Sequence, residues 1–205
     1  AETPWRLPGT CFVYRPPEVG PPEVGPLPAN RNGYVTFGTL SRAIRINDRV
    51  VQVWSEILRR VPTARLVVDS SSYQDVGVQQ ALIRRFEHHG IASSRLSVGL
   101  HSPGWGVLQG IDIGLDCFPH NSGTTLFESL YMGVPYVTLA GRPSVGRLGS
   151  TILNAVGLHD LITTSPEAYV ERAVAWAGDL QALAALRAGL RERMKRSALM
   201  DEVGF

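Results

Sequence analysis

The chain has 205 residues, of which 44% are hydrophobic and 19% are charged, with a formal net charge of +2 at pH 7. This composition is typical of a soluble protein with enough apolar material for a core of its own. The small net charge and the scattered arginines give no basis for nucleic acid or an anionic membrane as a partner.

The sequence also indicates a compartment. No apolar run approaches the length of a membrane span, and the first residues do not resemble a signal peptide. The two cysteines, Cys11 and Cys117, lie far apart, which suits a reducing compartment better than a disulfide framework. We therefore expect a cytoplasmic protein. Since the chain begins at Ala1 on residues typical of the middle of a protein, we also expect a fragment of a longer polypeptide.

Residues 1–32 are rich in proline and contain a direct duplication, Pro-Pro-Glu-Val-Gly at 16–20 and again at 21–25. Proline fixes φ and lacks an amide donor, so we expect neither a helix nor a central strand here. The segment is predicted to be an extended connector from a missing N-terminal half, with a plain spacer as the alternative. Four bulky side chains could pin it against a neighbouring surface: Trp5, Leu7, Phe12 and Tyr14.

Strands and helices alternate over residues 33–164. The predicted strands are 34–38, 65–69, 96–98, 111–115 and 135–139, and the predicted helices begin at Asp48, Val76, Thr124 and Val145, the last capped by Ser144. Apolar runs that are almost continuous, such as Leu66–Val68 and Ile111–Leu115, are typical of strands covered on both faces. The sequence therefore predicts an α/β fold over residues 33–164, built on a doubly wound parallel sheet.

Residues 165–205 are predicted to form C-terminal helices that pack on this domain. Ser165-Pro166-Glu167 provides a cap, a proline at the first helical position and an acidic first turn. A second helix restarts at Asp179 with the apolar stripe Leu183, Leu186, Leu190 and Met194. Its last turns carry four cations, interpreted as a solvated face that complements the helix dipole rather than as a binding patch: Arg191, Arg193, Lys195 and Arg196.

In a doubly wound sheet, ligands bind outside the carboxyl ends of the strands, where the strand order reverses. The informative loops are therefore 39–46, 70–75, 101–107, 117–125 and 141–144. Within the fourth loop, a predicted helix start leaves amide groups without partners, which makes it a candidate phosphate site: Ser122, Gly123, Thr124 and Thr125. The alternative is that Ser122 or Thr124 merely caps the helix.

Two arginines of the first loop, Arg42 and Arg45, could converge on the same anion, because a guanidinium matches phosphate oxygens and stays charged. Glu128 lies one turn inside the helix and could accept hydrogen bonds from ribose hydroxyls. The alternative for Glu128 is an ordinary exposed carboxylate.

Several other kinds of site are not indicated. The chain has no G-x-x-x-x-G-K-[ST], no G-x-G-x-x-G after a strand and no G-x-S-x-G elbow. Asp112 and Asp116 are not spaced as an Asp-x-Asp clamp, and the five histidines show no zinc-ligand spacing. We therefore expect no metal and no cofactor.

At this point the residues resemble a known family, the C-terminal catalytic half of the O-GlcNAc transferase and Spindly-type glycosyltransferases (glycosyltransferase family 41). The matching motifs cover nearly the whole chain, from Trp5-Arg6-Leu7-Pro8 to the end at 191–201. Between them come Phe37-Gly38, Ala-Ile-Arg-Ile at 43–46, Val-Trp-Ser-Glu-Ile-Leu-Arg-Arg-Val-Pro at 53–62, Asp116-Cys117-Phe118-Pro119, Gly123-Thr124-Thr125, Glu-Ser-Leu-Tyr-Met-Gly-Val-Pro at 128–135 and Val-Thr-Leu-Ala-Gly at 137–141.

The resemblance implies one Rossmann-like half of a GT-B fold, behind tetratricopeptide repeats, that binds a nucleotide-diphosphate sugar. It implies that Gly123, Thr124 and Thr125 hold the diphosphate, that Glu128 takes the place of a ribose-binding acid and that loop 101–107 borders the base. The family's catalytic lysine falls at Arg45. A base-stacking histidine falls at Gly104, which leaves His101 or Trp105 for that role.

The leading hypothesis is the donor-binding half of a protein O-glycosyltransferase. The resemblance implies transfer of GlcNAc from UDP-GlcNAc to Ser or Thr of a protein acceptor, with inversion and without metal. The general base would lie in the missing half, so the fragment alone is expected to be inactive. Alternatives are UDP-glucose transfer to Asn, GDP-fucose transfer to Ser or Thr, and a binding module without catalysis; Arg45 is the residue that divides enzyme from module.

Overall fold

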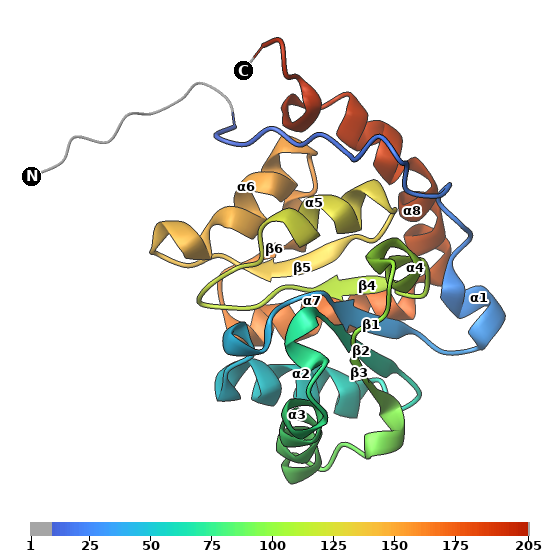
Figure 1. The fold of residues 1–205 in the computed structure, drawn as a ribbon, viewed down its shortest axis with the longest axis vertical. Coiled ribbons are helices and arrows are strands. Elements are labelled where there is room, and N and C mark those ends of the chain that lie inside the picture. The colour runs from blue at the N-terminus through green and yellow to red at the C-terminus, as the bar shows by residue number, and fades with distance from the viewer. Residues whose placement is uncertain (1–9, 205) are drawn as a thin grey trace, which may run out of the picture.

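The computed structural model describes residues 10–204. Its centre is a parallel sheet with the strand order β3-β2-β1-β4-β5-β6 (Figure 1). The strands are β1 (Thr36–Thr39), β2 (Arg65–Asp69), β3 (Leu96–Gly99), β4 (Ile113–Leu115), β5 (Tyr136–Leu139) and β6 (Ile162–Thr163). Strand order reverses between β1 and β4, which are neighbours in space but far apart in the chain. The predicted doubly wound α/β fold is confirmed.

Helices connect the strands and continue beyond them. They are α2 (Asp48–Arg60), α3 (Val76–His88), α4 (Gly104–Gln109), α5 (Thr124–Tyr131), α6 (Leu148–Ala155), α7 (Pro166–Gly178) and α8 (Leu180–Lys195). Three of the predicted caps are present: the side chains of Asn47, Ser165 and Asp179 accept hydrogen bonds from the amides of the first turns of α2, α7 and α8. The predicted Ser144 cap is wrong, because the N-cap of α6 is Arg147, which makes no side-chain cap bond.

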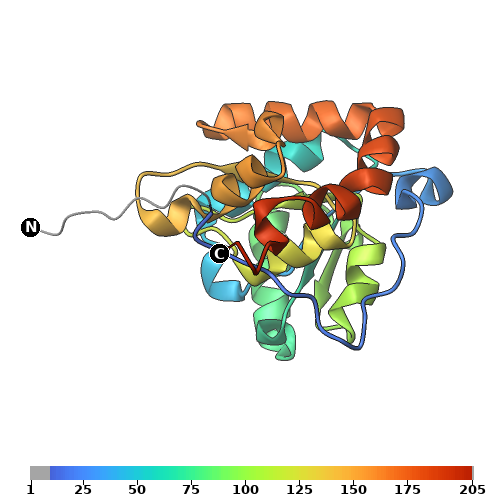
Figure 2. The same ribbon diagram turned by 90° about the horizontal axis from the view of Figure 1, so that it is seen from above.

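The helices cover both faces of the sheet. α2 and α7 lie side by side on one face (Figure 2), and α2 also contacts α3. α8 packs on α5 on the other face. Leu66 and Val68 of β2 are fully buried in the main core, whereas Val67 between them packs under α4 in a smaller apolar cluster. This alternation places α4 on the face opposite α2.

Glycines allow the two central strands to approach each other and their neighbours. Gly38 of β1 pairs with Gly114 of β4. A Cβ at position 38 would lie 2.3 Å from Cδ1 of Ile111, and one at position 114 would lie 2.7 Å from Cβ of Tyr136. The middle of the sheet, where the strand order reverses between β1 and β4, is therefore tightly packed.

Four local predictions were wrong. Residues 28–32 form a short helix, α1 (Pro28–Asn32), and a 3-10 turn (Ser144–Gly146) precedes α6, which starts at Leu148 rather than Val145. The loop expected at 101–107 contains the start of α4, and β6 was not predicted. For α1 the reason is a distant contact: the buried carboxylate of Asp112 accepts from the amide of Ala29 at 2.8 Å, which sequence spacing does not reveal.

The N-terminal segment crosses the outer surface of α5 and α8 as an extended strap, defined here as residues 10–27 (Figures 1 and 2). Tyr14 stacks on Phe127 with ring centroids 5.4 Å apart, and Phe12 meets the same ring edge-on. The amide of Tyr14 donates to the carbonyl of Leu199 at 2.7 Å. The predicted pinning by Phe12 and Tyr14 is confirmed, whereas Trp5 and Leu7 lie outside the described residues.

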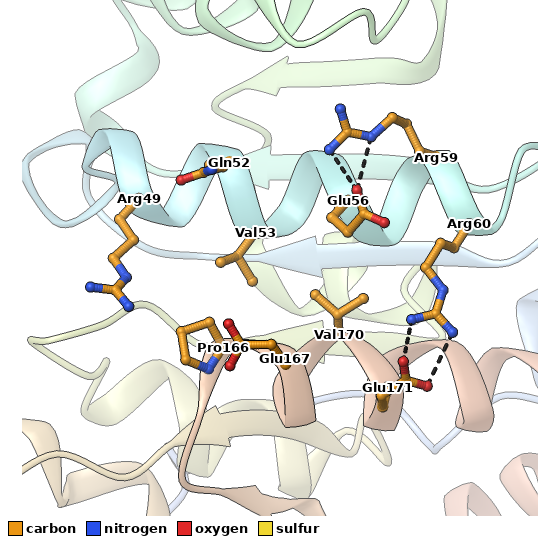
Figure 3. Close-up of a pocket in the computed structure, with 10 residues that line it drawn as sticks. All are labelled: Arg49, Gln52, Val53, Glu56, Arg59, Arg60, Pro166, Glu167, Val170 and Glu171. Atoms are coloured by element: carbon orange, nitrogen blue, oxygen red, sulfur yellow. Dashed lines mark hydrogen bonds and ion pairs between the residues drawn. The ribbon is translucent and has the colours of Figure 1, made fainter.

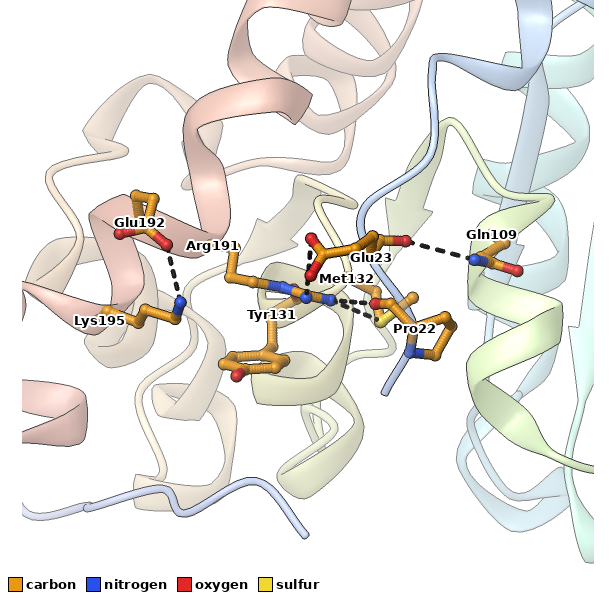
Figure 4. A network of polar contacts seen from close by, with 8 residues as sticks. All are labelled: Pro22, Glu23, Gln109, Tyr131, Met132, Arg191, Glu192 and Lys195. Carbon is orange, nitrogen blue, oxygen red and sulfur yellow. Dashed lines mark hydrogen bonds and ion pairs between the residues drawn. The ribbon is translucent and has the colours of Figure 1, made fainter. Parts of the chain in front are cut away.

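Two arginines of α8 hold the strap. Arg191 donates through Nε to the carbonyl of Tyr131 at 2.6 Å and through Nη2 to that of Pro22 at 2.7 Å, and its guanidinium lies 4.5 Å from the ring centroid of Tyr131 (Figure 4). Arg187, only 1% exposed, donates to the carbonyls of Gly25 and Ile111.

The solvated-face interpretation is therefore wrong for Arg191, which is 9% exposed. It holds for the other three cations of the same turns, Arg193, Lys195 and Arg196, which are exposed. Arg187 and Arg191 lie one turn apart, on the same side of α8 as the apolar stripe, and the carbonyl groups of the strap supply the partners that make their burial possible.

Candidate functional site

The loops after β1 and β4 meet at the point where the strand order reverses. The hydroxyls of Ser41 and Ser122 share a hydrogen bond, and Thr39 donates to Ser41 at 3.0 Å. On the other side of the junction, the Asn47 side chain that caps α2 also donates to the carbonyl of Phe118 at 2.7 Å. This is the location at which doubly wound sheets bind their ligands.

Helix α5 begins in this junction without a side-chain cap. Its N-cap is Gly123, and no side chain accepts a hydrogen bond from the first amides. Thr124 is exposed, while Gly123 and Thr125 are half-buried. The interpretation of Ser122 or Thr124 as a simple cap is therefore wrong. Uncapped amide donors and the positive end of the helix dipole are the features that bind phosphate at helix starts.

Asp116 fixes the loop that leads to α5. Its carboxylate accepts from the amide of Ser122 at 2.8 Å and from the hydroxyl of Thr138 at 2.7 Å, and its backbone carbonyl accepts from Tyr169 at 3.0 Å. Burial raises the pKa of Asp116 to about 7, although the hydrogen bonds from Ser122 and Thr138 lower it. Through its carboxylate, Asp116 thus links the loop after β4 to β5, and through its backbone carbonyl it also holds α7 beneath the candidate site. This role was not predicted from the sequence.

Ser122 supports this loop from within. It is 1% exposed, its amide donates to Asp116 and its hydroxyl bonds to Ser41. Its own amide is therefore engaged, and the donors left at the surface of the loop begin at Gly123. Among the four predicted phosphate-site residues, the structure brings Gly123, Thr124 and Thr125 to the outside and keeps Ser122 inside.

Arg45 lies at the same junction, whereas Arg42 projects outward. Arg45 is half-buried at the end of a 3-10 turn (Ala43–Arg45) and Arg42 is exposed. Burial raises the pKa of the Cys117 thiol to about 12, while the Ser41 hydroxyl and the positive charge of Arg45 lower it. The charge of Arg45 therefore acts on Cys117 in the loop between β4 and α5. The expected convergence of Arg42 and Arg45 on one anion stays a prediction.

Glu128 is half-buried on α5, and burial raises the pKa of its carboxyl group. Its charge also acts on the nearby Tyr14 hydroxyl. Since Glu128 follows Thr124 by four residues, the two side chains lie on the same side of the helix. Glu128 is thus not the ordinary exposed carboxylate that was its alternative interpretation.

A pocket of about 430 Å³ opens beside the start of α5. Gly123, Thr124 and Phe127 line one wall, Leu148 and Ile152 of α6 line another, and strap residues 12–15 complete it. The strap and the phosphate-site candidates therefore share one cavity. Another pocket, of about 480 Å³, lies between α2 and α7 and has none of the predicted site residues in its lining (Figure 3).

The charged side chains of that second pocket are largely matched with one another. Arg59 pairs with Glu56 within α2, and Arg60 of α2 pairs with Glu171 of α7. These exposed pairs satisfy local charge and contribute little stability. We therefore place the candidate site at the carboxyl edge of the sheet.

The residues predicted to border a base lie at the end of β3. His101 is exposed and pairs with Asp69 at the end of β2, while Trp105 of α4 is half-buried and packs against the smaller apolar cluster. Asp69 was not predicted to be a site residue. Its position as the last residue of a buried strand was the available signal.

Within residues 10–204, no group of three or more His, Cys, Asp and Glu side chains could hold a metal ion. The helices of this part of the chain are also too short or too polar to cross a lipid bilayer.

An all-parallel doubly wound sheet, with an uncapped helix start where the strand order reverses, defines a Rossmann-like unit of the kind that forms one half of a GT-B fold. The model of glycosyl transferase family 41 matches residues 26–204, so the chain belongs to this family.

Relatives from plants are similar over almost the whole chain. The chain is 38% identical over 205 residues to a protein of Petunia hybrida named probable UDP-N-acetylglucosamine-peptide N-acetylglucosaminyltransferase SPINDLY, and equally so over 208 residues to the Arabidopsis thaliana protein of that name. Each alignment covers 98% of this chain and 22% of the relative. The chain thus spans 22% of the length of these curated relatives.

Solved structures support the same grouping. A mutant O-GlcNAc transferase of Thermobaculum terrenum superposes with a TM-score of 0.80 and 34% identity, over 88% of this chain and 34% of that one. TarM of S. aureus, in a complex that includes UDP, gives a TM-score of 0.63 at 13% identity, over 91% of this chain and 35% of that one. The second likeness shows the fold alone.

Proposed function

We propose that this chain is the nucleotide-sugar-binding half of a protein O-glycosyltransferase that moves GlcNAc from UDP-GlcNAc to Ser or Thr side chains. The observation that carries the proposal is the uncapped start of α5 at the strand-order reversal, with the charge of Arg45 beside it. The names of the plant relatives and of the Thermobaculum enzyme support the choice of donor and acceptor.

Each part of the donor has a proposed partner. The amides from Gly123 to Thr125 hold the diphosphate, the carboxylate of Glu128 accepts from ribose hydroxyls and the loop at 101–107, with His101 and Trp105, borders the base. Arg42, exposed beside Arg45, adds charge that attracts the anionic donor. These positions all follow strand ends on one edge of the sheet, which is where such a ligand would extend.

The proposed reaction breaks the bond between the sugar C1 and the diphosphate as the acceptor oxygen bonds to C1 from the opposite face, so the configuration inverts. The acceptor hydroxyl gives its proton to the general base. Negative charge grows on the leaving diphosphate. Fixed amide dipoles and the guanidinium of Arg45 stabilise that charge without reorganising. Because these groups supply positive potential from the protein itself, we propose a reaction that needs no divalent metal and no cofactor.

Transfer is proposed for the whole protein, since this chain corresponds to 22% of its relatives. The general base and the acceptor groove would then be contributed by the other half, and the 205-residue chain alone would bind donor without turnover. A cytoplasmic location is part of the proposal. The two cysteines, exposed Cys11 and buried Cys117, are free thiols, which supports a reducing compartment.

A second candidate function is binding without catalysis. It is favoured by Arg45, which provides a charged fork where the resemblance expects a lysine. A panel of nucleotide sugars, incubated with the full-length protein and a peptide rich in Ser and Thr, separates the two candidates. We expect release of UDP and a mass gain on the peptide, both lost in Arg45→Ala and retained in the surface control Arg59→Ala. If none of the nucleotide sugars is turned over by a protein that still binds nucleotide, the binding module is favoured.

A further inference from the structure

His101 forms a pair with a buried carboxylate at the edge of the sheet where the base is expected. Asp69, the last residue of β2, has a side chain that is only 3% exposed, whereas the side chain of His101, just beyond β3, is 62% exposed. A carboxylate held inside the protein thus faces an imidazole that remains open to solvent.

Asp69 holds both the ring and the backbone of His101. Nδ1 lies 2.6 Å from Oδ2 of Asp69, and the same oxygen accepts from the amide of His101 at 2.9 Å. The ring also lies close to Gly99, because a Cβ added at that glycine would lie 3.4 Å from Cε1 of His101. Within residues 10–204, the other ring nitrogen, Nε2, has no hydrogen-bond partner.

The carboxylate also determines which nitrogen carries the proton. An ionised carboxylate only accepts hydrogen bonds, so the neutral imidazole places its N–H on Nδ1, facing Asp69. Nε2 then presents a lone pair to solvent. The pair therefore displays one hydrogen-bond acceptor in a fixed direction at the carboxyl edge of the sheet.

The pair lies within reach of the phosphate-site candidates. Strands β3 and β4 are separated by β2 and β1, so their ends lie roughly 14 Å apart at ordinary strand spacing. The loop that carries His101 continues into Gly104, which approaches the side chain of Leu40 after β1, a Cβ there lying 3.6 Å from Cδ2. A ligand with phosphates at α5 and a base beyond β1 would span this edge.

We propose that Nε2 of His101 selects the base of the donor by accepting a hydrogen bond from a ring N–H. Uracil and guanine carry such a ring N–H on the edge used for pairing, whereas cytosine and adenine present a lone pair at the corresponding nitrogen. A lone pair facing the lone pair of Nε2 costs binding free energy, because a desolvated acceptor is left without a donor. Asp69 is the positioning residue. This inference rests on the proposed nucleotide-sugar site.

The test compares the binding of UDP, GDP, CDP and ADP to the 205-residue chain by calorimetry at pH 8.5, where ordinary imidazoles are neutral. We expect UDP or GDP to bind at least about tenfold more tightly than both CDP and ADP, as for one well-directed hydrogen bond. In His101→Phe, which keeps a ring but lacks Nε2, the preference should fall to within about threefold.

Variants of Asp69 give the second part of the test. Asn at position 69 keeps an oxygen that can accept from Nδ1–H and from the amide of His101, so Asp69→Asn should retain the preference. Asp69→Leu releases the ring and should reduce the preference to the level of His101→Phe. Because the readout is a ratio of affinities, a modest loss of stability in either variant leaves it interpretable, and thermal unfolding verifies that each variant is folded.

Equal affinity for all four nucleotides, or an unchanged preference in His101→Phe, would overturn the inference while leaving the phosphate site intact. An Asp69→Leu variant that keeps the full preference would overturn the positioning role. Absence of binding by every nucleotide to the folded chain would instead overturn the proposed function, and the inference with it.

Discussion

The buried carboxylate of Asp116 lies 2.8 Å from the amide of Ser122 and accepts its hydrogen bond, which fixes the loop immediately before α5. Ser122 is thereby engaged inside the protein, and the uncapped start of α5 begins at Gly123. A buried acid therefore determines where the candidate anion site begins. The effect of this buried acid on the free energy of unfolding can be measured as a function of pH.

Asp116→Asn should remove a pH dependence of stability. Burial raises the pKa of Asp116 from 3.8 to about 7, so the folded state binds more protons than the unfolded state between these values. The free energy of unfolding should then fall as pH rises from about 4 through 7, by up to about 4 kcal/mol. Urea unfolding of both proteins across this range measures the difference between them, and a difference that stays flat with pH would contradict the prediction.

Gly149→Ala should be severely destabilising. The added Cβ would lie 2.3 Å from Oγ1 of Thr138 and 2.6 Å from Oδ2 of Asp116, so it would displace the groups that hold the loop. We expect the free energy of unfolding to fall by roughly 3 kcal/mol. Gly189→Ala is the matched control, because nothing lies within 4 Å of the new Cβ at this exposed position of α8. The free energy of unfolding of this control should rise by about 0.5–1 kcal/mol. Equal changes in the free energy of unfolding for Gly149→Ala and Gly189→Ala would refute the packing argument.

Arg191→Ala should destabilise the chain far more than Arg193→Ala. The first substitution leaves the carbonyls of Tyr131 and Pro22 without their donor and opens space at the strap. Two lost charged hydrogen bonds predict a decrease of roughly 2–4 kcal/mol in the free energy of unfolding. The exposed Arg193 should change it by less than about 0.5 kcal/mol. Thermal and urea unfolding compare the two variants, and similar losses would mean that α8 does not clamp the strap.

Tyr14→Phe should stabilise the chain. The Tyr14 hydroxyl is buried and has no hydrogen-bond partner among residues 10–204, so its removal relieves a desolvation penalty of about 1 kcal/mol while the stack on Phe127 remains. Tyr14→Ala removes the stack as well and should cost roughly 3 kcal/mol. Limited proteolysis within residues 10–27 should accelerate only in the alanine variant. A destabilised phenylalanine variant would indicate that the hydroxyl makes a favourable contact.

The sequence was informative where local chemistry decides structure. The strand around Leu66–Val68, the last three residues of the strand predicted at 111–115 and the caps at Asn47 and Ser165 follow from residues adjacent in the chain. The resemblance to family 41 is confirmed by the match over 26–204. The start of α5 was predicted from Ser-Gly-Thr-Thr. What these residues bind stays a prediction.

The buried arginines, the helix α1 and Asp69 were missed for one physical reason, which is a partner distant in sequence. Arg187 and Arg191 carry charge on a helix face that proves to be buried, and only the carbonyls of the strap explain why. Asp112 supports α1 from 83 residues away. Asp69 acquires its importance from His101, which follows a different strand. Sequence periodicity and motif spacing reveal contacts between residues that are close in the chain, and they do not reveal pairs that are far apart in it.

A calorimetric titration of UDP and GDP into the folded 205-residue chain, repeated with Arg45→Ala and Thr124→Val, tests whether a nucleotide binds at the start of α5. We expect saturable binding of at least one nucleotide, weakened by about 1–3 kcal/mol in each variant and unchanged in the surface control Arg59→Ala. A folded chain that binds neither nucleotide, or equal affinity in the parent and both site variants, would contradict this expectation.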